Sequence, residues 1–138
     1  MDFHIDIVSA ESEIWSGRAK MLFAPGEMGE LGIMPRHSAL LTRLIPGEVR
    51  VLGIDDSEQS YFITGGILEI QPHIVTILAD TAIRASDLDE AAAIEARQRA
   101  EDKIRDRKTD MDFARAKAEL VELSTMIEII KRVRKRNT

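Results

Sequence analysis

The sequence predicts a β + α protein, in which an N-terminal all-β unit is followed by a C-terminal antiparallel two-helix hairpin. All eight glycines lie between Gly17 and Gly66 and all four prolines between Pro25 and Pro72. The last 66 residues therefore hold neither of the residues that most often interrupt regular structure. In the first part, short apolar stretches recur at the spacing typical of sandwiches and barrels. We place the two domains at 1–85 and 86–138.

The strands expected in the first part are short apolar or alternating stretches bounded by turn residues. Phe3, Ile5 and Ile7 alternate with His4 and Asp6, which is typical of a strand with one solvent-facing side. Further strands are expected over 20–24, 48–52, 60–64, 67–70 and 73–78. Because Pro-Gly, Asp-Asp-Ser and Gly-Gly segments lie between them, antiparallel hairpins are the expected connections.

The second part has the pattern of two helices. Segment 86–90 offers N-cap side chains and first-turn carboxylates ahead of an alanine-rich helix that we expect to run to about residue 106. Thr109 or Asp110 can cap a second helix that continues to about Arg136. Apolar residues at heptad spacing form its seam: Phe113, Ala116, Leu120, Leu123, Ile127 and Ile130. Because two helices with one narrow seam bury little surface, we expect the hairpin to need a further apolar partner.

Composition excludes several classes of protein. The chain has 138 residues, 44% apolar content and a formal net charge of -5, which describes a folded globular protein. It has no cysteine, which excludes disulfides, thiolate metal sites and thiol nucleophiles and is compatible with a reducing, cytosolic setting. No apolar run approaches the ~18 to 20 residues that cross a bilayer, and the N-terminus lacks the basic start of a secretory signal. Membrane association is therefore expected only through a partner.

The sequence offers no constellation that predicts catalysis or a metal site. His4, His37 and His73 are far apart and lack the spacing of metal ligands or of a catalytic triad. The glycine pairs lack the residues of a phosphate-binding or dinucleotide-binding loop. Carboxylates of the first helix alternate with arginines and lysines, which indicates a solvated, ion-paired face. We expect neither catalytic nor metal-ligating residues.

The C-terminal segment 131–136 is the strongest electrostatic feature. It carries a charge of +5, whereas the residues before it sum to -10. Cations at a helix C-terminus complement the helix dipole. They could instead bind an acidic protein partner or nucleic acid, although too few aromatic residues are present for base stacking. A small adaptor that binds nucleic acid or an acidic protein is thus the alternative function.

Four strings, in order along the whole chain, give it a family resemblance: Val8-Ser9-Ala10-Glu11, Gly29-Glu30-Leu31-Gly32-Ile33-Met34-Pro35-Arg36-His37, Gly65-Gly66-Ile67-Leu68-Glu69-Ile70 and Leu78-Ala79-Asp80-Thr81-Ala82-Ile83-Arg84. With these strings the chain resembles the epsilon subunits of bacterial F-type rotary ATP synthases. The resemblance implies an antiparallel β-sandwich of about ten strands and a regulatory helical hairpin. It also implies a non-catalytic subunit of the central stalk, peripheral on the cytoplasmic side of the bacterial inner membrane.

The resemblance further implies partners and site residues. The sandwich would bind the gamma subunit and the ring of c subunits, and the Gly-Glu-Leu-Gly loop and following histidine would face the ring. These positions are Glu30, Leu31, Gly32 and His37. The hairpin would fold against the sandwich or extend toward the catalytic alpha and beta subunits and block ATP hydrolysis. Its tail would then contribute Lys131, Arg132, Arg134, Lys135 and Arg136.

Some members of this family bind ATP in the folded hairpin through an Ile/Leu-Asp-x-x-Arg-Ala motif and further arginines. Here Asp89 is kept, but Ala92 stands at the arginine of the motif. Two later arginine positions hold Glu122 and Met126, which leaves Arg99 as the remaining cation. Because a triphosphate depends on charge-assisted hydrogen bonds, we expect Asp89 and Arg99 to be at most a weak ATP-binding remnant, and no tightly bound cofactor.

Overall fold

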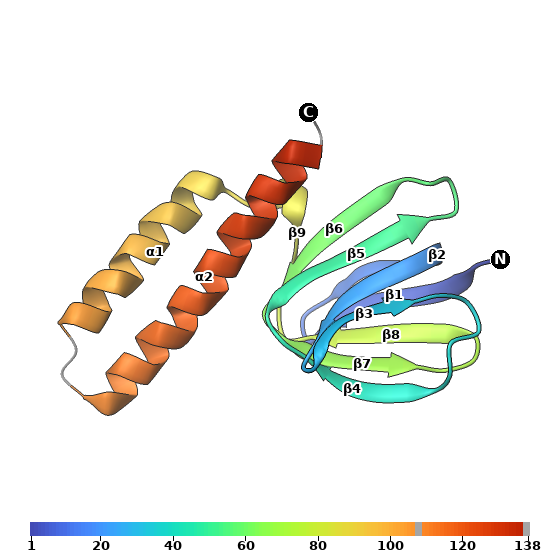
Figure 1. Cartoon of the computed structure of the whole chain (residues 1–138), viewed down its shortest axis with the longest axis horizontal. Helices are drawn as coiled ribbons and strands as arrows, with labels where there is room; N and C mark the ends of the chain where they lie inside the picture. The colour runs from blue at the N-terminus through green and yellow to red at the C-terminus, as the bar shows by residue number, and fades with distance from the viewer. Residues whose placement is uncertain (107–108, 137–138) are drawn as a thin grey trace. The chain divides into compact units, whose positions relative to one another are not determined.

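The computed structural model describes residues 1–106 and 109–136. The chain divides into two compact units, Met1–Arg84 and Ala85–Thr138. Strands make up the first unit and helices the second (Figure 1). This order confirms the predicted fold class, a β-sandwich followed by a two-helix hairpin.

The first unit is one continuous, twisted set of strands: β1 (Phe3–Ser9), β2 (Glu13–Gly26), β3 (Gly29–Ile33), β4 (Leu40–Leu44), β5 (Gly47–Gly53), β6 (Glu58–Ile63), β7 (Gly66–Ile70), β8 (Ile74–Ala79) and β9 (Ala82–Arg84). Their order in the sheet is β1, β8, β7, β4, β2, β5, β6 and β9, with β3 beside β2. The 14 residues of β2 pair first with β1 and then with β5 and β3. The long strand β2 therefore connects the two halves of the sandwich.

Alternation along the strands creates the core. In β1, Phe3, Ile5 and Ile7 are buried while His4 and Asp6 are half-buried, as the sequence pattern predicts. The largest core side chains come from both halves of the sandwich and include Ile5, Ile7, Leu22, Ile33, Val49, Val51, Tyr61, Ile63, Leu68 and Ile77. Burial of apolar surface on this scale is the main stabilising contribution to the unit.

The fully described residues 1–84 form nine strands, in line with the approximately ten that the resemblance implied. Three other details of the sheet differ from the expectation. The pair β1–β8 is parallel, which is possible because a long stretch of chain separates the two strands. The Gly-Glu-Leu-Gly segment, expected as a loop, is the short strand β3, whose backbone pairs with β2. Strand β2 also extends well beyond the predicted 20–24.

The second unit contains a short 3-10 turn, η1 (Ala85–Asp87), and two helices, α1 (Glu90–Arg105) and α2 (Asp110–Arg136). The two helices lie side by side and antiparallel in Figure 1. Asp89 caps α1 by accepting a hydrogen bond of 3.2 Å from the Ala92 amide. Thr109 caps α2 by accepting one of 3.0 Å from the Asp112 amide. Both helix starts therefore use side chains from the predicted capping segments.

The interior of the hairpin is small. Ala93, Ile127 and Ile130 are buried together, and Leu88 and Met126 pack against them. Of the predicted seam, Ala116 is also buried, whereas the apolar residues between it and Ile127 are only half-buried. The large buried side chains of this cluster thus lie in the half of the hairpin where α1 begins and α2 ends, while the small Ala100 and Ala116 are buried in the other half.

Candidate functional site

The segment predicted to face a partner begins with a tight hairpin between β2 and β3. Gly26 and Gly29 are paired across it. A Cβ at position 26 would lie 2.7 Å from the Gly29 carbonyl oxygen, and Gly29 has a φ of +131°. Both positions therefore require glycine. The turn presents Met28, which is 99% exposed. Two constrained glycines therefore shape a turn that exposes an apolar side chain.

The three residues that follow have different environments. Glu30 lies opposite Pro25 and its side chain is 52% exposed. Leu31 is half-buried and packs against the sandwich core. Gly32 is exposed beside Phe23, where an added Cβ would meet the ring at an ordinary contact distance of 3.6 Å. Neither backbone conformation nor packing requires glycine at position 32.

His37 lies in the connection between β3 and β4. Its amide donates a hydrogen bond of 3.3 Å to the Met34 carbonyl oxygen, and Arg36 between them has a φ of +67°. The imidazole Nδ1 is 2.7 Å from the Ser38 carbonyl oxygen, which fixes the ring of this exposed residue. The predicted ring-facing residues are therefore supplied by one edge strand and the turn that follows it.

Backbone hydrogen bonds bring a second connection to the same end of the unit. The Glu27 amide donates to the Arg43 carbonyl oxygen at 3.2 Å, and the Ile45 amide donates to that of Pro25 at 2.9 Å. Ile45 is exposed, as is Met28 on the adjoining turn. Sequence reasoning missed this apolar pair. Its only signal was a pair of large apolar residues next to turn residues.

Cations of the C-terminal segment lie on the last turns of α2. Arg134 forms an ion pair with Glu90, in the first turn of α1. Lys131, Arg132 and Lys135 are exposed. The side chain of Arg136 lies outside the described part of the chain. Because a carboxylate near a helix N-terminus and a cation near a helix C-terminus both complement the dipoles, the Glu90–Arg134 pair joins the two ends of the hairpin favourably.

The two residues proposed as an ATP-binding remnant are not brought together. Asp89 is the N-cap of α1, where its carboxylate is engaged with the Ala92 amide. Arg99 is exposed further along the same helix. Ten residues of α-helix span about 15 Å along the axis, more than one phosphate group bridges. The role that the structure gives to Asp89 is helix capping.

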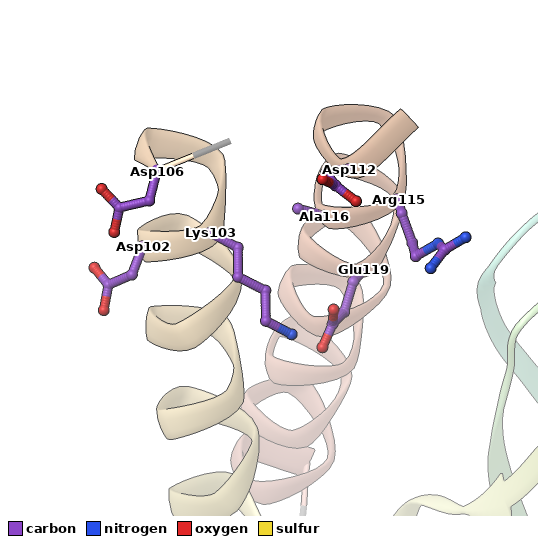
Figure 2. A pocket seen from close by; sticks show the side chains of 7 residues that line it. All are labelled: Asp102, Lys103, Asp106, Asp112, Arg115, Ala116 and Glu119. Atoms are coloured by element: carbon purple, nitrogen blue, oxygen red, sulfur yellow. The ribbon is translucent and has the colours of Figure 1, made fainter. Parts of the chain in front are cut away.

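A hollow of about 420 Å³ lies at the other end of the hairpin, lined by Asp102, Lys103, Asp106, Asp112, Arg115, Ala116 and Glu119. Figure 2 shows Lys103 and Glu119 extending between the helices, whereas Asp102 and Asp106 are directed away from α2. The lining holds four carboxylates and two cations. This charge balance disfavours a triphosphate, and the side chains do not converge on a common point.

One constellation in the sandwich unites the residue types of a hydrolytic triad. Ser16 donates a hydrogen bond of 2.6 Å to Asp6, and both its hydroxyl and the carboxylate lie within 3.1 Å of the same His4 nitrogen, Nε2. In a triad the acid and the nucleophile contact different ring nitrogens. Here the Ser16 hydroxyl donates its hydrogen bond to the Asp6 carboxylate instead of to a histidine nitrogen. This hydrogen bond holds the pKa of Asp6 below its usual range. The cluster connects β1 to β2 without activating a nucleophile.

No cluster of three or more histidine, aspartate or glutamate side chains is arranged to hold a metal ion in residues 1–106 and 109–136. Within those same ranges, neither helix combines the length and the apolar content that spanning a bilayer requires.

Comparisons with known proteins find family matches for both units. The family model described as "ATP synthase, Delta/Epsilon chain, beta-sandwich domain" matches residues 2–85. The model described as "ATP synthase, Delta/Epsilon chain, long alpha-helix domain" matches residues 86–122. An ATP synthase epsilon chain of Nitrosococcus oceani is 57% identical over 136 residues, covering 99% of this chain and 97% of that one. One from Thioalkalivibrio sulfidiphilus is also 57% identical, covering 98% and 96%. These matches confirm the resemblance drawn from the four sequence strings.

Solved structures share the fold. A chain in the cryo-EM structure of the Euglena gracilis mitochondrial ATP synthase, OSCP/F1/c-ring in rotational state 1, matches with a TM-score of 0.74 and 16% identity, covering 99% of this chain and 82% of that chain. A chain from the central stalk/c-ring of the Tetrahymena thermophila mitochondrial ATP synthase matches with a TM-score of 0.67 and 14% identity, covering 94% and 97%. At these identities the likeness concerns the arrangement of the strands and helices.

Proposed function

The chain belongs to the ATP synthase delta/epsilon chain family, and from that premise we propose that it is a non-catalytic rotor subunit of an F-type ATP synthase. In this role the sandwich joins the gamma subunit to the c-ring, and the hairpin restrains ATP hydrolysis through the alpha and beta subunits. The subunit is peripheral, on the cytoplasmic side of the bacterial inner membrane.

The observation that carries the proposal is the surface built around β3. Two constrained glycines display Met28 to solvent, and Ile45 is exposed on the adjoining connection. Glu30 and His37 lie on the strand and turn that follow. A fully exposed methionine on a rigid turn has no role in folding, whereas apolar side chains rimmed by polar ones are typical of a protein interface. We assign this surface to the c-ring.

A second apolar surface supports a separate contact with gamma. Ile67 on β7 and Leu78 on β8 are register partners on the outer side of the sheet, and both are exposed. Leu41 on the neighbouring strand β4 is exposed as well. Strands with one wetted side normally place polar residues there. We therefore propose that gamma covers this stripe of Leu41, Ile67 and Leu78.

The hairpin is suited to a regulatory role because little holds its helices together. A small cluster of Ala93, Ile127 and Ile130 is buried between the helices, with Leu88 and Met126 beside it. An interface of this size can exchange one apolar partner for another at a cost of a few kcal/mol. The ion pair with Glu90 occupies Arg134 in the closed hairpin, so extension toward the catalytic subunits would release that cation for docking.

The experiment that tests the rotor role is reconstitution of the cognate ATP synthase after removal of this chain. Addition of the wild-type chain should restore ATP-driven proton pumping, whereas a Glu30→Ala, His37→Ala double variant should bind gamma but restore less pumping. Full restoration by the double variant would remove the c-ring assignment. Loss of gamma binding by the variant would indicate that these residues act through the fold.

The adaptor alternative has no independent support. It rests on the charge of segment 131–136, and Arg134 in that segment is engaged with Glu90. The epsilon chain of Nitrosococcus oceani matches over 99% of this chain, tail included, so the tail is better explained as part of the regulatory hairpin. We propose no nucleic-acid partner.

A further inference from the structure

Arg50 is a half-buried cation on β5 of the sandwich. It lies on β5 between Phe23 of β2 and Ser60 of β6, its register partners. Its guanidinium carbon is 4.2 Å from the centre of the Phe23 ring, and the side chain is only 26% exposed. Stacking on an aromatic ring fixes the plane of a guanidinium and adds a cation–π attraction. The aromatic stack therefore holds the Arg50 side chain on the sheet independently of any carboxylate.

Three carboxylates surround this one cation. Glu30 Oε1 lies 3.2 Å from Arg50 Nη2, within hydrogen-bond distance. Glu48 Oε1 lies 3.8 Å from Nε, and Glu58 Oε1 lies 3.9 Å from Nη1. The Nε group is buried and makes no hydrogen bond within the described residues. The well-formed hydrogen bond of Arg50 thus goes to Glu30, the carboxylate that comes from a different hairpin.

The other two carboxylates determine the electrostatic environment of Glu30 in the absence of Arg50. Glu48 is nearly fully buried and accepts a hydrogen bond from the Ser60 hydroxyl. It is therefore fixed to the sheet and cannot move away. Like charges close together repel, so removal of the guanidinium would cost Glu30 its hydrogen bond and leave it near two groups of the same charge. Glu30 is on the short edge strand β3 and its side chain is 52% exposed, so it can then rotate into solvent.

We propose that Arg50 is the positioning residue of Glu30. It holds one carboxylate oxygen against the Phe23–Arg50 stack and leaves the other oxygen free to accept a hydrogen bond from a cationic or N–H donor of the ring-facing partner. Arg50 itself does not touch the partner. This inference rests on the proposed assignment of the β3 surface to the c-ring.

The test measures binding of the full-length chain to the gamma–c-ring assembly depleted of this subunit. Arg50→Gln and Glu30→Gln should each weaken binding by about two- to five-fold, the range for a partly exposed charge pair. In the Glu30→Gln background, Arg50→Gln should have no further effect. Arg18→Gln is the matched control, because Arg18 is an exposed cation of the same sandwich, 2.5 Å from Asp2, and binding should be unchanged.

The outcomes separate the positioning role from the c-ring assignment. If Glu30→Gln leaves binding unchanged, both the c-ring assignment and the role of Arg50 fail. If Glu30→Gln weakens binding but Arg50→Gln does not, the positioning role alone fails. An effect of Arg50→Gln that persists at full size in the Glu30→Gln background means that Arg50 acts through the fold, which also overturns the proposal.

A second pair of variants keeps the proposal testable if Arg50→Gln does not fold. Arg50→Lys retains the charge but loses the planar donor pair, so it should restore binding only in part. Phe23→Leu removes the stack while leaving Arg50 in place. It should weaken binding in the wild-type background and have no effect in the Glu30→Gln background; an equal effect in both backgrounds contradicts the proposal.

Discussion

Replacement of Glu90 by glutamine should loosen the end of the hairpin by a small, calculable amount. The Glu90–Arg134 pair is only partly shielded, since the Arg134 side chain is 63% exposed and that of Glu90 is 21% exposed. Exposed ion pairs contribute about 0.2 to 1 kcal/mol. Because 1.4 kcal/mol corresponds to a tenfold change, the opening equilibrium of the hairpin should rise by about 1.4- to 5-fold.

Replacement of a buried side chain in the apolar cluster should open the hairpin more than loss of the ion pair. Ile127 is 2% exposed and packs with Ala93 and Ile130. Replacement of a buried isoleucine by alanine costs about 2 to 5 kcal/mol, which corresponds to an increase of roughly thirty-fold or more in hairpin opening. The apolar cluster, rather than the ion pair, should therefore determine how often the helices separate.

Amide hydrogen exchange in the isolated full-length chain measures both effects. Amides of the helices near Ala93 and Ile130 should exchange slightly faster in Glu90→Gln and much faster in Ile127→Ala. Glu95→Gln is the matched control, since Glu95 is exposed on the same helix, and exchange should not change. Equal acceleration by Glu90→Gln and Ile127→Ala, or acceleration by Glu95→Gln as large as that by Glu90→Gln, would refute the reasoning.

Three further predictions follow from the site geometry. Gly29→Ala forces an alanine to a φ of +131°, so it should destabilise the sandwich by about 1 to 3 kcal/mol in urea unfolding, whereas Gly32→Ala should stay within about 0.5 kcal/mol; equal losses would contradict the geometry. The lowered pKa of Asp6 means that its stabilising contribution is present above the usual carboxyl pKa of about 4 and is lost as the pH falls through the lowered value. The stability advantage of the wild-type chain over Asp6→Asn should therefore shrink below about pH 4, and a constant difference down to pH 2 would show that Asp6 does not titrate as argued. Neutralisation of Arg132 and Lys135 should relieve inhibition of ATP hydrolysis at low salt, as high salt should for the wild-type chain; equal inhibition at every salt concentration would rule out electrostatic docking.

The sequence predicted the order of the units and the capping segments because these depend on local features. Glycine and proline stop abruptly at residue 72, and Asp89 and Thr109 carry capping side chains at the expected helix starts. The strand β3 was missed because its Gly-Glu-Leu-Gly segment has little intrinsic strand propensity, and pairing with β2 overrides it. The parallel pairing of β1 with β8 depends on contacts distant in sequence, which periodicity cannot reveal.

The contacts of the candidate site were less predictable than its residues. Family resemblance singled out Glu30, but no local pattern links it to Arg50, which lies twenty residues away on another strand. Likewise, segment 131–136 was recognised as basic, while the pairing of Arg134 with Glu90 follows only from the antiparallel arrangement of the helices. Charge density can be read along the chain, whereas the partner of each charge is fixed by the fold.

We propose that the sandwich binds gamma and the c-ring, whereas the hairpin inhibits ATP hydrolysis. ATP hydrolysis by the cognate complex tests these separate roles most directly. The complex depleted of this chain should be measured alone, with the full-length chain, and with residues 1–85 after circular dichroism has verified that this fragment is folded. We predict that both proteins bind gamma and restore coupling, but that only the full-length chain suppresses hydrolysis. Equal suppression by residues 1–85, or failure of the folded fragment to join the complex, would contradict the account.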